Sequence, residues 1–201
     1  MAKRGWLESP ASWSHAADDE MSGKLPDYLA RGLRVVFCGT AAGKTSAFRG
    51  HYYAGAGNLF WTYLYRARIT TEPLFPSTDQ RVLEFGVGLT DLAKKVAASS
   101  DRSLRAHYDV DAFVKKIERH EPAWVAFHGK EAAKIVSKAL GYGGAVALGK
   151  QAWRVARSDV FVLPSASGAN RARSRLEGKA DRVEWFKELA ELLPPLTLLS
   201  R

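Results

Sequence analysis

Four short apolar runs, interleaved with stretches of helical periodicity, constrain the fold of this chain more than any other feature. The runs span residues 33–38, 82–89, 124–127 and 160–163. Short runs that end at glycine, proline or polar residues are typical of strands buried on both faces of a sheet. Each run is followed by apolar residues at helical spacing, over 59–65, 110–117, 129–140 and 183–193. This alternation predicts a three-layer α/β/α fold around a central, mainly parallel four-stranded sheet.

The length and composition fit a single water-soluble domain. With 201 residues, the chain is long enough to bury one core. We expect one domain over residues 33–201, preceded by an irregular N-terminal arm, 1–32, in which Trp6 and Trp13 are isolated bulky groups. No stretch has the roughly 18 consecutive apolar residues of a membrane span. The first residues lack the apolar segment of a secretory signal, so we expect a cytoplasmic protein.

Cysteine content and net charge indicate which bonds and which partners the chain can have. The only cysteine, Cys38, excludes an internal disulfide and, inside an apolar run, is expected to be a small core residue. Lysine and arginine number 30 against 21 aspartates and glutamates, which gives a formal net charge of +9. This excess favours a polyanionic partner such as nucleic acid. Many basic proteins bind no nucleic acid, so the assignment depends on individual residues.

Ligands of parallel α/β sheets bind beyond the carboxyl ends of the strands, which directs attention to four loops. They begin at Gly39, after Leu89, at His128 and at Pro164. The first, residues 39–46, contains Gly-Lys-Thr and partly resembles a phosphate-binding P-loop. However, three residues instead of four separate its glycines, and no apolar run ends in an aspartate suited to Mg²⁺. The pattern therefore does not predict a nucleotide hydrolase.

The same loop fits another pattern together with the sequence that follows it. Three motifs occur in order: Gly39-Thr40-Ala41-Ala42-Gly43, then Gly50-His51-Tyr52-Tyr53, then Asn58-Leu59-Phe60-Trp61 at the start of a helix. Further similarity lies at residues 86–91, 129–130 and 163–168. Spread over residues 25–193, these motifs resemble the mismatch-specific uracil-DNA and thymine-DNA glycosylases of the uracil-DNA glycosylase superfamily. In that family the first motif is Gly-x-Asn-Pro-Gly.

The resemblance implies an enzyme that flips a base out of DNA and hydrolyses its N-glycosidic bond. Such a site must hold a water and stabilise both an oxocarbenium-like sugar and a departing base anion. Tyr53 matches the family's aromatic residue that stacks on the flipped base. The resemblance further implies that the backbone around Thr40 and Ala41, with Gly39 and Asn58, contacts the base.

Ala41 occupies the position of the family's catalytic asparagine, which orients the water, so another group must supply that function. Asp91 is the leading candidate, because a carboxylate at a strand terminus can orient water or accept a hydrogen bond from uracil N3–H. The alternative is that Asp91 caps a helix that follows it. His51 and Lys44 are secondary catalytic candidates: His51 can donate to the leaving base, and Lys44 can neutralise a phosphate or the base anion. Both are also common kinds of surface residue.

The last loop corresponds to the family segment that enters the minor groove and contacts phosphate. The resemblance implies that Ser165, Ser167 and Gly168 permit close approach of the backbone to DNA. Ser165 is also a candidate base contact, at a position where many uracil-excising relatives carry His or Asn. The basic stretch that follows is either a solvated loop or a set of further DNA contacts: Asn170, Arg171, Arg173 and Arg175.

These residues predict a monofunctional uracil-DNA glycosylase that acts as a monomer on single- or double-stranded DNA and needs no cofactor. For His128 no second His or Cys lies at ligand spacing, so we expect a hydrogen-bonded core histidine and no metal site. The alternative function is a catalytically weak or inactive DNA-binding protein that senses lesions. Substitution of the catalytic asparagine by Ala41 is compatible with either.

Overall fold

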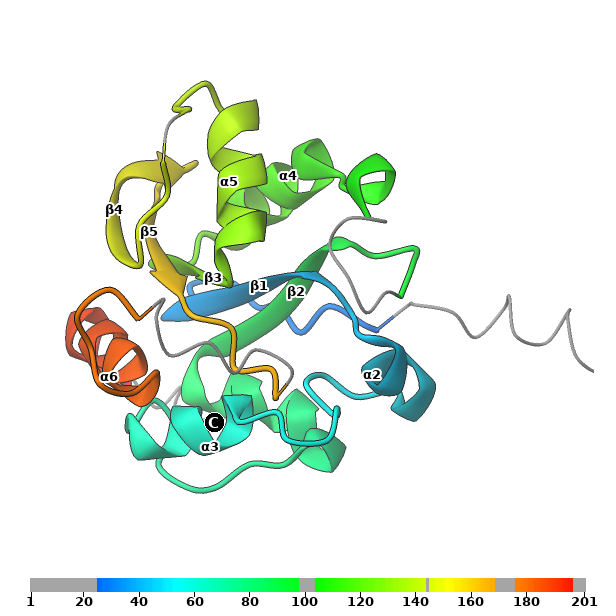
Figure 1. The fold of residues 1–201 in the computed structure, drawn as a ribbon, viewed down its shortest axis with the longest axis vertical. Helices are drawn as coiled ribbons and strands as arrows, with labels where there is room; N and C mark the ends of the chain where they lie inside the picture. The colour runs from blue at the N-terminus through cyan, green and yellow to red at the C-terminus, as the bar shows by residue number, and fades with distance from the viewer. Residues whose placement is uncertain (1–24, 98–103, 144, 169–175, 197–201) are drawn as a thin grey trace, which may run out of the picture.

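A computed structural model describes residues 25–97, 104–143, 145–168 and 176–196. Its centre is one five-stranded sheet in the order β2-β1-β3-β5-β4 (Figure 1). The strands are β1 (Val35–Ala41), β2 (Val87–Ala93), β3 (Trp124–His128), β4 (Gly149–Val155) and β5 (Ser158–Leu163). The α-helices are α2 (Lys44–Arg49), α3 (Phe60–Arg66), α4 (Val110–His120), α5 (Lys130–Ala139) and α6 (Val183–Leu192). Two 3-10 helices are η1 (Pro76–Phe85) and η3 (Arg105–His107).

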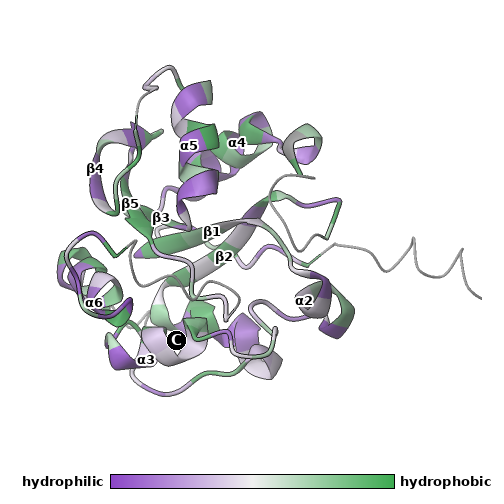
Figure 2. Cartoon of the chain, viewed as in Figure 1, coloured by the Kyte–Doolittle hydropathy of each residue, from purple (hydrophilic) through white to green (hydrophobic). Residues whose placement is uncertain are grey.

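Helices cover both faces of the sheet, which confirms the expected three-layer α/β/α fold. In Figure 1, α4 and α5 lie on one face, and α3 and α6 lie on the other. Most residues of β1, β2, β3 and β5 are buried between these layers. In Figure 2, β5 is largely green, whereas the edge strand β4 is largely purple. None of the described helices is long and apolar enough to cross a bilayer.

The sheet has five strands instead of the expected four. The additional strand, β4, pairs antiparallel with β5 at one edge of the sheet. Along β4 buried and exposed positions alternate: Trp153 and Val155 face inward, whereas Lys150 and Arg154 are exposed. A half-solvated edge strand has no continuous apolar run. The search for such runs therefore missed it.

The second apolar run is divided between two elements. Its first part, Val82 to Phe85, belongs to the 3-10 helix η1, which ends at Gly86 with a left-handed φ of 65°. β2 then begins at Val87 and continues to Ala93. Asp91 therefore lies within β2, so the alternative that it caps a following helix is wrong. A short buried run has the same apolar signature in a helix and in a strand, which explains the misplaced start.

The segment that precedes β1 packs alongside β2. The backbones of Tyr28 and Leu89 exchange two hydrogen bonds, of 3.0 and 2.9 Å, and the side chain of Leu25 is buried. This contact covers the free edge of β2, which would otherwise present unpaired backbone groups. The expected irregular arm is thus described only from residue 25 onward, and Trp6 and Trp13 lie outside the described residues. Its boundary at residue 32 stays a prediction.

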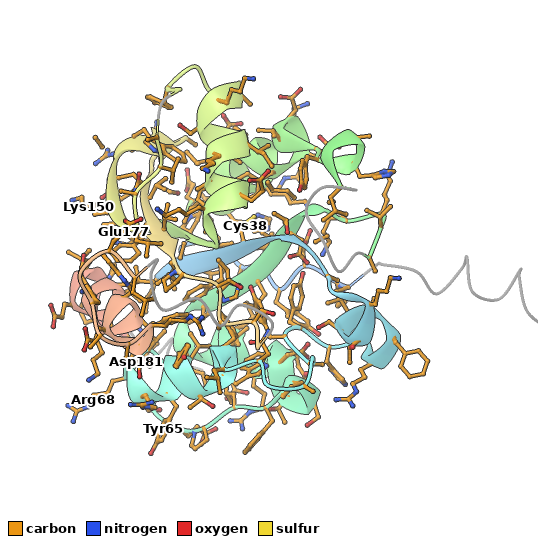
Figure 3. All side chains as sticks on the ribbon, viewed as in Figure 1. Cys38, Tyr65, Arg68, Lys150, Glu177 and Asp181 are labelled. Carbon is orange, nitrogen blue, oxygen red and sulfur yellow. The ribbon has the colours of Figure 1, made fainter. Side chains whose placement is uncertain are left out.

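Cys38 is a core residue, as expected. Its side chain is fully buried in β1 (Figure 3), and burial raises the pKa of its thiol well above the ordinary value. A thiol that is buried and protonated is a poor nucleophile. Cys38 therefore contributes packing beneath the end of β1, and the chemistry must come from the residues that follow it.

Candidate active site

The carboxyl ends of β1 and β2 meet at one pair of residues. Gly39 of β1 is in register with Asp91 of β2. A β-carbon added to Gly39 would lie 2.5 Å from Oδ1 of Asp91, far inside van der Waals contact. Glycine at this position therefore lets the carboxyl group of Asp91 rest directly on the β1 backbone, at the edge of the sheet where α/β folds bind their ligands.

Asp91 is a buried carboxyl group with unusual surroundings. Its exposed fraction is 5%, and none of the hydrogen bonds found in the described residues involves its carboxylate. Burial raises its pKa from the ordinary 3.8 to about 6; the positive charge of Lys94 opposes this shift, and the negative charge of Asp27 adds to it. An acid with a pKa near neutrality can exchange a proton under physiological conditions. The geometry therefore gives Asp91 the properties of an acid–base group.

Tyr53 lies against the aromatic core below the site. Its ring stacks on Phe60, with 3.8 Å between ring centroids, and meets His128 edge to face at 4.9 Å. Its backbone has a φ of 52°, a strained conformation for a bulky residue. Its hydroxyl oxygen is the one buried side-chain polar atom without a hydrogen-bond partner among the described residues. Burial raises the pKa of Tyr53 well above its ordinary value, so the hydroxyl keeps its proton and remains a hydrogen-bond donor.

His128, at the end of β3, joins two strand ends. Its Nε2 accepts a hydrogen bond of 2.9 Å from the backbone N–H of Ala166. Burial lowers its pKa to about 4, so the ring is neutral at physiological pH and can act as this acceptor. The described residues contain no group of three or more His, Cys, Asp or Glu side chains arranged to hold a metal ion. His128 is hydrogen-bonded, as expected from the sequence, but it is half-buried and not a full core residue.

The loop after β5 packs against the loop that precedes α3. The backbone N–H of Leu59 donates to the carbonyl of Ala166 at 3.0 Å. Gly168 approaches Gly57 so closely that a β-carbon on Gly168 would lie 2.9 Å from the Gly57 carbonyl oxygen. A side chain is therefore excluded at Gly168 by packing within the protein. The two loops therefore pack directly against each other.

Two expected site residues in these loops, Asn58 and Ser165, accept hydrogen bonds from nearby backbone N–H groups. Oδ1 of Asn58 accepts a hydrogen bond of 3.0 Å from the backbone N–H of Phe60, at the start of α3. Oγ of Ser165 accepts one of 3.3 Å from the backbone N–H of Ser167. These bonds shape the loops, as Asn and Ser side chains commonly do. Base contact by either side chain stays a prediction.

The first motif is part of the sheet for longer than the sequence suggested. β1 continues through Thr40 to Ala41, which pairs with Ala93 of β2. On its other side, the pairing of β1 with β3 ends at Cys38 and Phe127. The last three residues of β1 thus extend beyond β3. Their backbone on that side lies at the edge of the sheet and is not covered by the neighbouring strand.

His51 and Lys44, the secondary catalytic candidates, have none of their described contacts with Asp91. Nδ1 of His51 lies 3.3 Å from Oδ1 of Asp79, a fully buried carboxylate that also accepts hydrogen bonds from the Tyr28 hydroxyl and the Tyr52 N–H. Lys44 is an exposed residue at the start of α2. Asp79 is a residue that the sequence analysis missed, because it lies in η1 with no motif around it. Its partners are brought to it only by the tertiary structure.

A second group missed from the sequence lies beside Asp91. Asp27 receives ion pairs from Lys94 at 3.0 Å and Lys116 at 2.6 Å and a hydrogen bond from Thr90 at 2.7 Å. Burial raises the pKa of Asp27, but the bonds and charges of the two lysines and Thr90 outweigh it, so the pKa falls below the ordinary value. These residues come from three distant segments, which no local pattern reveals. They set the charge around Asp91.

The expected DNA contacts are described only in part. Ser165, Ser167 and Gly168 are half-buried in the loop after β5. Four other expected contacts lie outside the described residues: Asn170, Arg171, Arg173 and Arg175. Their assignment to DNA binding therefore stays a prediction.

Comparison with known proteins agrees with this architecture. The solution NMR structure of a candidate uracil DNA glycosylase from Methanosarcina acetivorans superimposes with a TM-score of 0.53 at 22% sequence identity, over 84% of this chain and 98% of that one. At this identity the likeness shows a shared fold. A sequence profile of the Uracil DNA glycosylase superfamily matches residues 26–191, which include β1, β2 and every other strand of the sheet. The chain therefore belongs to the uracil DNA glycosylase superfamily.

Proposed function

We propose that this protein is a monofunctional DNA glycosylase that hydrolyses the N-glycosidic bond of uracil, or of a closely related base, in DNA. The observation that supports this most is the carboxyl group of Asp91, buried on Gly39 and outside the hydrogen bonds of the described residues. Burial of a carboxylate costs free energy, which is the cause of its raised pKa. Groups whose pKa is moved toward neutrality concentrate at active sites. Membership of the superfamily supports the glycosylase role.

In the proposed reaction, the bond between the base nitrogen and C1′ of the deoxyribose breaks, and its electron pair leaves with the base. A water molecule attacks C1′ and passes a proton to the Asp91 carboxylate. The base anion takes up a proton after it departs, so the products are free base and an abasic sugar. The ionised form of Asp91 is therefore the active one, and a pKa of about 6 leaves most of it ionised at neutral pH.

Electrostatics favour a role for Asp91 at the sugar instead of at the base edge. A carboxylate stabilises the positive charge that develops on the sugar, whereas close contact with the departing base anion would be repulsive. The positive charges of Lys94 and Lys116 lower the pKa of Asp91 and so oppose the effect of its burial. These two lysines keep the carboxylate available at the pH at which the base must leave.

Two features support binding of the base beside Asp91. The Tyr53 hydroxyl is a buried donor without a partner, which suits a carbonyl oxygen of a bound base. The backbone from Gly39 to Ala41 extends beyond β3 at the sheet edge, where N–H groups can stabilise charge on the base without any particular side chain. We assign base binding to Tyr53 and this backbone. Contact with the DNA strand is assigned to the Ser165–Gly168 loop.

Uracil release from DNA with one deoxyuridine, followed by alkaline cleavage at the abasic site, tests the proposal. We expect release by the wild type and a loss of roughly 100-fold or more for Asp91→Asn, with DNA affinity retained. Asp111→Asn is the matched control, because Asp111 is an exposed aspartate on α4. Unchanged turnover in Asp91→Asn would remove Asp91 from the mechanism. If no tested base is released, the glycosylase proposal fails.

A second function, lesion sensing without cleavage, is favoured by Ala41, which has no side chain to hold the water that the family's asparagine orients. Such a protein would keep the site and bind DNA in a base-dependent manner. Tight binding to uracil-containing DNA with no abasic product would select this alternative. Release of uracil would eliminate it.

A further inference from the structure

A cavity of about 380 Å³ shares Tyr53 and Asn58 with the candidate active site. Both share the loop from Tyr53 to Asn58, but none of the residues that line the cavity is Gly39, Asp91 or Ser165. Its other walls are Arg49 at the end of α2, residues of α3, and residues 73–76, which lead into η1. The cavity is therefore a groove beside the base site, and its volume is in the range of small-molecule sites.

Two aromatic rings are exposed in the walls of this groove. Phe75 is 61% exposed and Tyr65 is 45% exposed. Figure 3 shows Tyr65 on the outer surface of α3. The described residues contain six exposed large hydrophobic side chains, and four of them, including Phe48 and Leu59, lie between positions 48 and 75. Of these four, Phe75 and Tyr65 line the groove, and exposed aromatic side chains in a groove are characteristic of a binding site.

The charge of the groove favours an anionic occupant. Arg49 is the only charged residue in its lining, which contains no aspartate or glutamate. Nη1 of Arg49 donates to the carbonyl of Ala54 at 3.0 Å, which holds the guanidinium beside the Tyr53–Asn58 loop. Aromatic rings next to an arginine suit a flat group that carries a phosphate, because bases stack on rings and guanidinium groups pair with phosphates. A basic peptide would find no carboxylate in this lining with which to form an ion pair, which argues against such a peptide as the occupant.

We propose that this groove binds the unpaired nucleobase that neighbours the excised base in the same DNA strand, through stacking on Phe75 and Tyr65. The location of the excised base rests on the proposed function, whereas the binding of a single strand does not. Because Tyr53 and Asn58 lie in both sites, a strand whose target base lies at Tyr53 continues into the groove with its next nucleotide. A base inside a duplex is stacked and paired and cannot enter. The groove therefore confers a preference for single-stranded or locally opened DNA.

Fluorescence anisotropy with a labelled single strand of about ten nucleotides containing one deoxyuridine tests the inference. Stacking contributes roughly 1–3 kcal/mol per base, so we expect Phe75→Ala and Tyr65→Ala each to weaken binding by about fivefold or more. Phe48→Ala is the matched control, because Phe48 is 79% exposed on α2 but does not line the groove. We expect that variant to bind within about twofold of the wild type.

Wild-type affinity in Phe75→Ala and Tyr65→Ala, or an equal loss in Phe48→Ala, would overturn the inference. So would an equal loss of affinity for the matched duplex, because the rings would then contact paired DNA. Uracil release is recorded for each variant. If the wild type binds the strand through the two rings but releases no base, the proposed function fails and the groove assignment stands. If uracil is released and both variants bind normally, the groove assignment alone fails, and a protein partner becomes the occupant to test.

Discussion

Asp79 and Asp91 are both buried aspartates, with exposed fractions of 0% and 5%, but their surroundings differ. Asp79 accepts hydrogen bonds from the Tyr28 hydroxyl and the Tyr52 N–H and lies 3.3 Å from the ring of His51. No hydrogen bond to the carboxylate of Asp91 is found among the described residues. Since burial of a carboxyl group whose charge is not offset by nearby bonds lowers stability, Asp91 is better explained by a functional role than by a structural one. Asp79, in contrast, holds three segments together.

Removal of the Asp79 carboxylate should have the largest effect on stability. Asp79→Ala leaves the Tyr52 N–H and the Tyr28 hydroxyl without their acceptor, so we expect the free energy of unfolding to fall by roughly 4 kcal/mol. Urea denaturation measures the change, with Ser77→Ala, an exposed position of the same 3-10 helix, as the control. A loss below about 1 kcal/mol would show that Asp79 is not the structural partner described here.

Gly39→Ala should have the next largest effect. The added β-carbon would meet Oδ1 of Asp91 at 2.5 Å, so we expect a loss of stability of roughly 3 kcal/mol from overpacking. Gly43→Ala is the control, because no atom lies within 4 Å of its added β-carbon. Truncation of the carboxylate in the double variant Gly39→Ala/Asp91→Ala should recover most of the loss. Additive effects in this cycle would contradict the contact between the two residues.

Asp91→Asn should stabilise the protein at neutral pH. The folded-state pKa of about 6 lies above the ordinary 3.8, so the folded protein holds this proton more tightly than the unfolded chain does. Stability contributed by that proton is fully present below the ordinary pKa and is lost as pH rises through the folded pKa. We expect Asp91→Asn to gain roughly 2 kcal/mol at pH 7 and nothing near pH 3. A loss of stability at pH 7 in chemical denaturation would mean that the carboxylate is paired like that of Asp79.

The smallest effect is expected at Lys44. This exposed side chain lies on α2, so Lys44→Ala should leave stability and the base-release step unchanged within about twofold. Loss of a positive charge should weaken DNA binding slightly at low salt, and the difference should fade as salt is added. Single-turnover release and anisotropy at two salt concentrations measure both quantities. A release rate reduced tenfold or more would return Lys44 to the catalytic group.

The parallel strands were predictable from the sequence because their signals are local. The buried runs that form β1, β3 and β5 are continuous, and the motifs that follow β1 matched a known family pattern. β4 was missed because an edge strand alternates between apolar and polar residues. The start of β2 was misplaced because Val82 to Phe85 are apolar and buried in a 3-10 helix just as they would be in a strand.

The unpredicted parts of the site depend on contacts between distant segments. Asp27 meets Lys94 and Lys116 only after the N-terminal segment has packed against β2. The same limit applies to Asp79, whose partners lie 27 or more residues away in the sequence. The resemblance to the glycosylases and the carboxylate side chain identified Asp91 as a candidate. Whether its carboxylate is paired is decided by the fold, and this pairing is what distinguishes the two aspartates.

The dependence of single-turnover uracil release on pH tests the central claim most directly. If the ionised carboxylate of Asp91 takes the proton from the attacking water, the rate rises as pH increases through about 6 and is constant above that value. The Asp91→Asn variant should then release uracil slowly, at a rate that does not rise near pH 6. A wild-type rate that is the same on both sides of pH 6, or a step that persists in Asp91→Asn, would contradict the assignment of Asp91 as the catalytic carboxylate.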